Sequence, residues 1–440
     1  VARLCQAAPH RQLWLSSYAL DSYLTENGRL AFVITQSVFK SAGGGEGFRR
    51  FRLADNTPIG VLAVDDMVEI SPFEGASNRT AVVSLQRGRD VKYPVGYNLW
   101  RKSGHWQRLP QDASLDEVRA TTSVRRLVAQ PVDECDRNSP WITARPRLLG
   151  VVSKVLGASA YTARKGITAG VNGVFWVEVL DRQKDGLLVV SNLAERGKRT
   201  VDGVEAVIEP ELVYPLLRGR DVHRWCAEPS ACIIVTHRPK ERLRAIPESE
   251  MAVSFPKTYS YLRQFEGLLR TSGIYRRYFR KTDPFYSLFN VGDYTFARYK
   301  LVFREIATEL TCSVVGPVDG RPVIPDHKLV LCPLDSEVEA HFLCSVLNSS
   351  IARLVVASYG IETQLSTHVL EHVRVPRFDA SNAIHGRLAG LSQEAHAGMS
   401  ARDSSRMARI ENAIDGAAAE LWGLAQEDLK EIQESLAEMG

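Results

Sequence analysis

The sequence of 440 residues lacks most of the features that mark metal-binding, secreted and membrane proteins. Its seven cysteines are an odd number, no Cys-x-x-Cys pair occurs, and no second pair of ligands completes a zinc site around Cys226 and Cys232. Such scattered cysteines indicate reduced thiols, so we expect a cytoplasmic protein. No secretory signal opens the chain, and no apolar run approaches the roughly 18 residues of a membrane helix, so we expect no membrane partner.

Several catalytic signatures are also missing. The sequence has no HExxH, no GxSxG and no acidic cluster with nuclease spacing. The glycines at 43–45 are followed by Glu46 and lack the Lys-Ser/Thr of a phosphate-binding P-loop. We therefore interpret 43–45 as a connection between a strand and a helix.

What remains is an ordinary globular composition, 45% hydrophobic and 24% charged. The length predicts two to three domains. The formal net charge of +4 does not by itself indicate nucleic acid, but residues 426–440 are acidic, so the middle of the chain is more basic than the total suggests.

The most informative segment is 29–53, RLAFVITQSVFKSAGGGEGFRRFRL. Leu30 to Thr35 predicts a buried strand, which is followed by the glycine loop and a basic helix. Upstream, apolar residues at helical spacing predict a helix that ends at Asn27-Gly28. Further strands are expected at 61–70 and 80–87, joined by a short connection that allows them to be antiparallel.

The rest of the chain divides by composition. Residues 91–145 contain many polar residues and prolines and predict a connector with short helices. Residues 146–376 are rich in predicted strands, with helices near 259–269 and 341–359. Residues 377–440 carry apolar residues at three-four spacing and predict helices separated by Gly423.

The order of helix, Asn-Gly, buried strand, glycine loop and basic helix resembles the back half of the catalytic domain of adenine-specific DNA methyltransferases. The likeness is to the large type IIG restriction-modification and phage-defence kinds. That family holds S-adenosylmethionine on a glycine-rich loop and the extruded adenine on an Asn/Asp-Pro-Pro-aromatic turn. This sequence contains neither motif. The resemblance thus implies S-adenosylmethionine for the complete enzyme, and truncation of this chain, which we expect to bind no cofactor and to have no catalytic residues.

The loop 163–177, ARKGITAGVNGVFWV, is similar to the opening of the target-recognition domain in the same family. Lys165, Thr168 and Asn172 are the candidate DNA contacts, because amide, hydroxyl and ammonium groups contact phosphates and base edges. The alternative is a tight turn that binds no ligand.

Three further strings supply basic candidates. In YPLLRGRDVHRW (214–225), which resembles the start of the second part of the recognition domain, Arg218, Arg220 and Arg224 flank Asp221, so DNA contact and an internal ion pair are both open. In 260–281 basic residues alternate with aromatics, which suits phosphate binding and stacking but also fits a solvated helix. In 297–306 two basic residues stand at the mouth of a strand. The candidates from these last two strings are Arg276, Arg277, Lys300 and Arg304.

Taken together, the sequence predicts an α/β remnant of a Rossmann-like methyltransferase sheet, then an α+β target-recognition domain and C-terminal helices. The expected boundaries are 1–90, 91–145 for the connector, 146–376 for recognition and 377–440. The expected partner is double-stranded DNA, and a separate catalytic or nuclease chain is a further candidate. The alternative function is a stand-alone, non-enzymatic DNA-specificity subunit that works with a separate catalytic chain.

Overall fold

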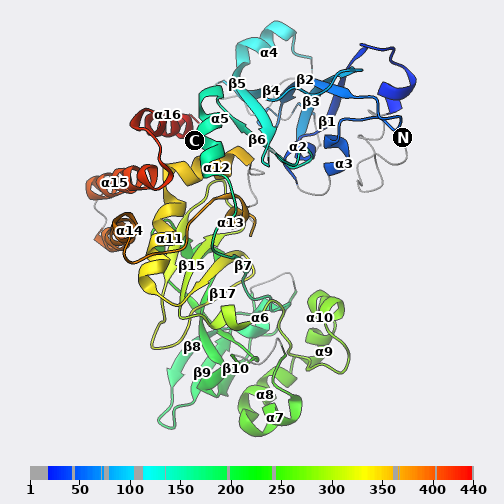
Figure 1. The fold of residues 1–440 in the computed structure, drawn as a ribbon. Helices are drawn as coiled ribbons and strands as arrows, with labels where there is room; N and C mark the ends of the chain where they lie inside the picture. The colour runs from blue at the N-terminus through cyan, green and yellow to red at the C-terminus, as the bar shows by residue number, and fades with distance from the viewer. Residues whose placement is uncertain are drawn as a thin grey trace. The chain divides into compact units, whose positions relative to one another are not determined.

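The computed structural model divides the chain into two compact units (Figure 1). The first comprises Val1–Leu156, Leu354–Glu362 and Leu424–Gly440, and the second comprises Gly157–Arg353 and Thr363–Gly423. The structure describes residues 18–41, 45–70, 72–73, 79–103, 112–133, 135–195, 199–239, 244–359, 365, 367–401 and 404–438.

A six-stranded sheet in the order β1-β3-β2-β4-β5-β6 forms the first unit. β3 is antiparallel to both β1 and β2, as the short connection predicted, and Ile34 pairs with Ala81. The aromatic rings of Phe39 and Trp141 stack 4.7 Å apart in the core beside the sheet. The strands are β1 Arg29–Thr35, β2 Ile59–Asp66, β3 Thr80–Arg87, β4 Val95–Lys102, β5 Thr122–Pro131 and β6 Trp141–Ala144.

Short helices accompany this sheet. The basic helix predicted after the glycine loop is one turn, α3 (Glu46–Arg49), and α2 (Ser37–Lys40) precedes the loop. Of the loop glycines, Gly43 and Gly44 lie outside the described residues, as does the start of the helix predicted before Asn27. The remaining helices before residue 157 are α4 Leu115–Thr121, η1 Pro146–Leu148 and α5 Leu149–Val155.

The expectation of a helical connector at 91–145 was wrong, because this segment supplies three strands of the sheet. β4 pairs with β5 over eight residues and runs parallel to β2. Its sequence, VGYNLWRK, has no apolar run, since one face of the strand is polar. Tyr97 and Trp141 are almost fully buried, so sparse large aromatics make the core here instead of β-branched runs.

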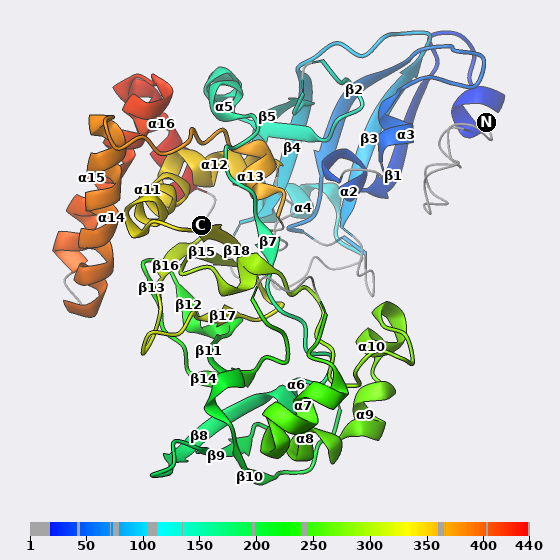
Figure 2. The ribbon, with the colours of Figure 1, turned by 60° about the horizontal axis from the view of Figure 1, so that its bottom comes forward.

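The second unit contains two larger sheets and a two-stranded ribbon. One sheet has the order β10-β9-β8-β14-β11-β17, the other has the order β16-β15-β18-β7, and β12 pairs with β13. Helices α7 and α8 pack against the first of these sheets through Met251, Tyr261 and Leu262 (Figure 2). The strands are β7 Arg164–Lys165, β8 Trp176–Arg182, β9 Leu188–Asn192, β10 Glu205–Ile208, β11 Val213–Leu217, β12 Val222–His223, β13 Cys226–Ala227, β14 Ala231–Ile234, β15 Tyr299–Arg304, β16 Cys312–Val315, β17 Ile324–Pro325 and β18 Leu329–Leu334.

The helices after residue 157 are mostly short until the C-terminal part. Gly423, with φ of 63°, separates α15 from α16, as the sequence predicted. The helix expected at 341–359 is broken at Ser349, because the backbone N–H and hydroxyl of Ser350 both donate to the Asp415 carboxylate at 2.7 Å. The helices are α6 Asn172–Phe175, η2 Pro210–Leu212, η3 Gly219–Asp221, α7 Glu248–Ser254, α8 Pro256–Arg263, α9 Glu266–Arg270, α10 Gly273–Tyr278, η4 Asp293–Phe296, α11 Glu337–Asn348, α12 Ser350–Tyr359, α13 Val369–His372, α14 Ala383–Ala401, α15 Ser404–Trp422 and α16 Gln426–Ala437.

Among the described residues, no single helix has the length and apolar character to cross a membrane. The pair α11 and α12 meets that test only when joined across its 61° bend.

Candidate nucleic-acid interface

The glycine-rich loop after β7 is shaped by its packing against a neighbouring segment. A Cβ on Gly166 would stand 2.0 Å from the backbone oxygen of Asp326. Backbone N–H groups of Gly166 and Ile167 donate to the carbonyls of Leu329 and Pro325 at 3.0 and 2.9 Å. The close approach that requires glycine at this position is therefore between two parts of the chain itself.

The same loop is joined to the basic helix α10. Thr168 and Phe289 exchange backbone hydrogen bonds of 2.8 and 3.0 Å, and the Phe289 ring stacks 3.8 Å from that of Tyr278 on α10. Gly170 adopts φ of 75°, and a Cβ there would lie 3.1 Å from Ile274 of α10. The fold thus brings together two segments that are about a hundred residues apart in sequence.

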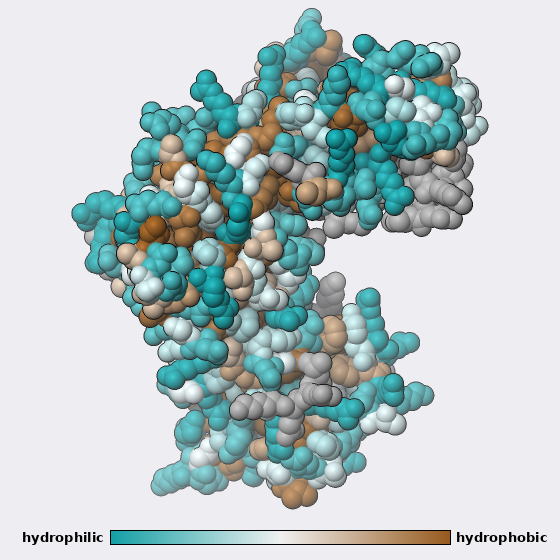
Figure 3. All heavy atoms as spheres, in the orientation of Figure 1, coloured by the Kyte–Doolittle hydropathy of each residue, from teal (hydrophilic) through white to brown (hydrophobic). Residues whose placement is uncertain are grey.

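Helix α10 carries two exposed arginines beside this junction. Arg276 and Arg277 are exposed, and neither forms an ion pair within the described part of the chain. The guanidinium of Arg277 lies 5.3 Å from the centre of the Tyr278 ring. Hydrophilic and hydrophobic side chains are mixed around α8–α10 on the face seen in Figure 3. Exposed cations beside aromatic rings suit a phosphate backbone.

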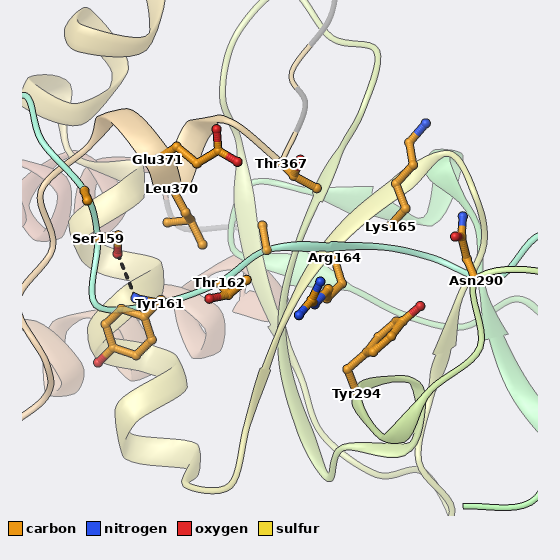
Figure 4. Close-up of a pocket in the computed structure, with 12 residues that line it drawn as sticks. Ser159, Tyr161, Thr162, Arg164, Lys165, Asn290, Tyr294, Thr367, Leu370 and Glu371 are labelled. Carbon is orange, nitrogen blue, oxygen red and sulfur yellow. Dashed lines mark hydrogen bonds between the residues drawn. The ribbon is translucent and has the colours of Figure 1, made fainter. Parts of the chain in front are cut away.

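A pocket of about 530 Å³ adjoins the start of the loop (Figure 4). The guanidinium of Arg164 lies 5.9 Å from the centre of the Tyr294 ring, and the side chain of Asn290 stands nearby on a residue with φ of 58°. These three residues were not among the candidates predicted from the sequence. The basic pair Arg164-Lys165 could have indicated Arg164 from the sequence, but no sequence pattern links Asn290 or Tyr294 to Arg164.

Lys165 forms an ion pair with the buried Glu305 at 2.6 Å, and its side chain remains 45% exposed. His327 is half-buried nearby, and burial together with the charges of Lys328 and Lys165 lowers its pKa. Lys165 therefore retains access to solvent within a basic neighbourhood. Asn172 is partly exposed at the first position of α6.

The structure does not support Arg218 as a DNA contact. Its side chain is 6% exposed, its Nε lies 3.3 Å from the equally buried Asp221 carboxylate, and its Nη2 donates to Ser230. The backbone N–H of Arg218 also donates to Asp221 at 2.8 Å. The internal ion pair that the sequence left open is thus the interpretation that the structure favours. Arg220, in contrast, has a side chain that is 56% exposed and lies 3.7 Å from Asp221.

Arg224 is also engaged inside the second unit. It donates to the backbone carbonyl of Asn348 at 2.8 Å and pairs with Glu411 of α15 at 3.2 Å. Burial lowers its pKa, although Glu411 and Asp415 act in the opposite direction. A guanidinium held at both ends in this way links the β-rich part to α11 and α15, which favours a structural role for Arg224.

Lys300 was also predicted to contact DNA, but it is 1% exposed and its ammonium donates to the carbonyl of Ala297. Burial lowers its pKa to about 7. Arg304 is partly exposed, and its Nε donates to the carbonyl of Val222 at 2.8 Å. The glycine loop and α10 together carry five of the predicted residues, Lys165, Thr168, Asn172, Arg276 and Arg277. We name the surface of these two joined segments the loop–α10 face.

Comparison with known proteins supports the resemblance inferred from the sequence. No protein-family profile matches the chain. It is 29% identical over 149 residues to the type II methyltransferase M.NspV of Nostoc sp. (strain ATCC 29411 / PCC 7524), a match that covers 33% of this chain and 29% of that enzyme. The predicted resemblance to methyltransferases is thus confirmed by a relative named as a type II methyltransferase.

Two solved structures give weaker similarities. The type IIL restriction-modification enzyme MmeI, solved with DNA, matches 96% of this chain and 51% of its own at 10% identity and a TM-score of 0.49. The type IIG restriction endonuclease BpuSI matches 90% of this chain and 48% of its own at 12% identity and a TM-score of 0.31. TM-scores below 0.5 do not establish a shared fold. The chain spans about half of these two proteins, and its match covers under a third of M.NspV.

Proposed function

We propose that this chain is the DNA-recognition portion of an adenine-specific DNA methyltransferase and that the loop–α10 face binds duplex DNA. The observation that carries the proposal is the junction of Thr168 with Phe289 and of Phe289 with Tyr278, which places the glycine loop beside exposed arginines. The sequence similarity to a type II methyltransferase supplies the class of function.

The first unit supports a connection with a catalytic domain. An antiparallel strand, β3, stands between β1 and β2, in line with the antiparallel last strand of methyltransferase sheets. β1 passes directly into α2 through Gln36, with no glycine in the turn. The described residues at this turn offer no glycine-rich loop of the kind that holds S-adenosylmethionine. We propose that the complete enzyme uses this cofactor while this chain alone does not bind it.

Binding of a duplex oligonucleotide by the full chain, followed by fluorescence anisotropy, tests the proposed interface. The double variant R276A/R277A removes two cations from the loop–α10 face. The matched control, R182A/K184A, removes two exposed cations from the β8–β9 hairpin of the same unit. Each phosphate contact contributes about −0.9 to the slope of log affinity against log salt concentration. The magnitude of this slope should therefore be smaller by about 2 in R276A/R277A than in wild type.

Equal slopes for wild type, R276A/R277A and R182A/K184A would exclude the loop–α10 face as the phosphate-binding surface. Calorimetric titration with sinefungin, an analogue of S-adenosylmethionine, tests separately whether this chain binds the cofactor. A micromolar dissociation constant for the chain alone would contradict the proposal that its cofactor site is missing.

A further inference from the structure

Three arginines converge on the C-terminal end of α16 within the first unit. Arg145 forms an ion pair with the Glu438 carboxylate, and Nη2 of Arg125 lies 3.5 Å from the other oxygen of that carboxylate. Arg101 donates to the backbone carbonyl of Glu438. Arg125 also donates to the hydroxyl of Ser435 at 2.7 Å. We name Arg101, Arg125 and Arg145 the arginine cluster.

The arginine cluster has more positive charge than the carboxylates paired with it. Within the described residues, the ion pairs of this cluster are those with Glu438 and the one between Arg101 and Glu69 at 2.8 Å. Glu431 and Glu434 act on Arg145 from further away, through their charge. Three guanidinium groups therefore share two paired carboxylates.

Arg125 is the least satisfied member of the cluster. Its side chain is only 10% exposed, and its Nε has no hydrogen-bond partner in the described part of the chain. Burial lowers the pKa of Arg125, the Glu438 carboxylate acts in the opposite direction, and repulsion from Arg145 and Arg101 adds to the effect of burial. A free phosphate ion offers more acceptor oxygens and more negative charge than one carboxylate, and a backbone phosphodiester offers one negative charge on two free oxygens. Guanidinium groups match the geometry of both.

The carboxylate that contacts the cluster lies at the exposed end of α16. Glu438 follows the last residue of α16, and its side chain is 53% exposed. The apolar anchors of α16, Leu429 and Ile432, lie about one and a half to two and a half turns earlier. Release of Glu438 requires the last turn to move and Arg101 to give up the Glu438 carbonyl, whereas Leu429 and Ile432 stay buried.

We propose that the arginine cluster is a phosphate-binding site whose internal occupant is the Glu438 carboxylate. A phosphate group, either free or in a nucleic-acid backbone, takes the place of that carboxylate and accepts from Arg125 and Arg145. This inference concerns the first unit and does not depend on the loop–α10 face.

The test compares E438Q with the matched control E427Q in the full chain. Each variant removes one carboxylate at an end of α16, and Glu427 is exposed at the end opposite Glu438. Thermal unfolding is followed while sodium phosphate replaces sodium chloride at constant ionic strength, so that binding is read as a rise in Tm. Removal of the competing carboxylate should tighten the apparent Kd for phosphate about tenfold in E438Q relative to E427Q, roughly the effect of one charge-assisted hydrogen bond.

Two further measurements make the outcome specific. The double variant E438Q/R145Q should lose the response to phosphate, because one of the two arginines facing the carboxylate is gone. A duplex oligonucleotide that binds E438Q more tightly than E427Q would identify the nucleic-acid backbone as the source of the phosphate, whereas a response to inorganic phosphate alone would identify the free ion. Equal responses of E438Q and E427Q to both ligands would overturn the proposal.

Discussion

The buried ion pair between Arg218 and Asp221 leads to a prediction that separates folding from DNA recognition. Replacement of Arg218 by Met keeps much of the side-chain volume but leaves Asp221 buried without its principal counter-charge. Breaking a buried pair by removing one partner typically costs about 3–5 kcal/mol. Asp221 keeps the backbone N–H of Arg218 at 2.8 Å and the hydroxyl of Ser230, so we expect the lower end of this range, about 3 kcal/mol.

Arg220 provides the control, because it lies two residues away and interacts with the same carboxylate. Its side chain is 56% exposed and stands 3.7 Å from Asp221, and exposed pairs of this kind contribute about 1 kcal/mol or less. R220A should therefore leave stability nearly unchanged. Urea unfolding monitored by hydrogen exchange at residues 213–234 measures the local free energy of opening for both variants.

A double-mutant cycle identifies the origin of the loss. If the unpaired charge is responsible, the additional change D221N should recover part of the stability of R218M, because a neutral amide is less costly to bury. Equal losses in R218M and R220A, or no recovery in R218M/D221N, would refute the assignment of Arg218 to the folding of this segment.

Three other predictions follow from buried positions in the second unit. Gly166→Ala should lower the free energy of unfolding by about 1–3 kcal/mol, because the added Cβ would overlap Asp326. Gly203→Ala should be nearly neutral in thermal unfolding, because a Cβ at Gly203 would have no atom within 4 Å. Equal Tm values for the two variants would contradict this prediction. Burial raises the pKa of Asp326 to about 6, so its protonated form is favoured in the folded state and stability should fall as the pH rises from about 4 to 6. The variant D326N should abolish this pH dependence and be about 2 kcal/mol more stable than wild type at pH 8. An unchanged pH profile of stability in D326N would contradict this prediction. Burial lowers the pKa of Lys300 to about 7, so stability should rise as the pH increases from about 7 to 10. Lys300→Met should flatten this rise and stabilise the protein at pH 7 by roughly 2–4 kcal/mol without altering DNA affinity. Weaker DNA binding by a folded Lys300→Met variant would show that Lys300 belongs to the DNA interface.

Local patterns were sufficient for several elements of the first unit and of the C-terminal part. The β-branched runs near Leu30 and at 80–87 predicted strands that the structure contains as β1 and β3. Apolar residues at three-four spacing predicted the C-terminal helices, and Gly423 predicted their separation. Each of these patterns lies within one helix or strand, and its spacing follows from the side-chain periodicity of that helix or strand. The strands β4 and β5 escaped prediction because their polar face interrupts any apolar run.

The sequence alone determined the class of protein that this chain resembles, through the order and spacing of motifs such as 29–53 and 163–177. Only the tertiary structure decided which basic residues are free to meet a ligand. Arg218 and Arg220 share one short basic string, yet the first is buried and the second exposed, because Leu217 pairs with Pro325 of β17, more than a hundred residues away. Burial depends on such long-range strand pairing, and a local string of arginines does not predict which strands will pair.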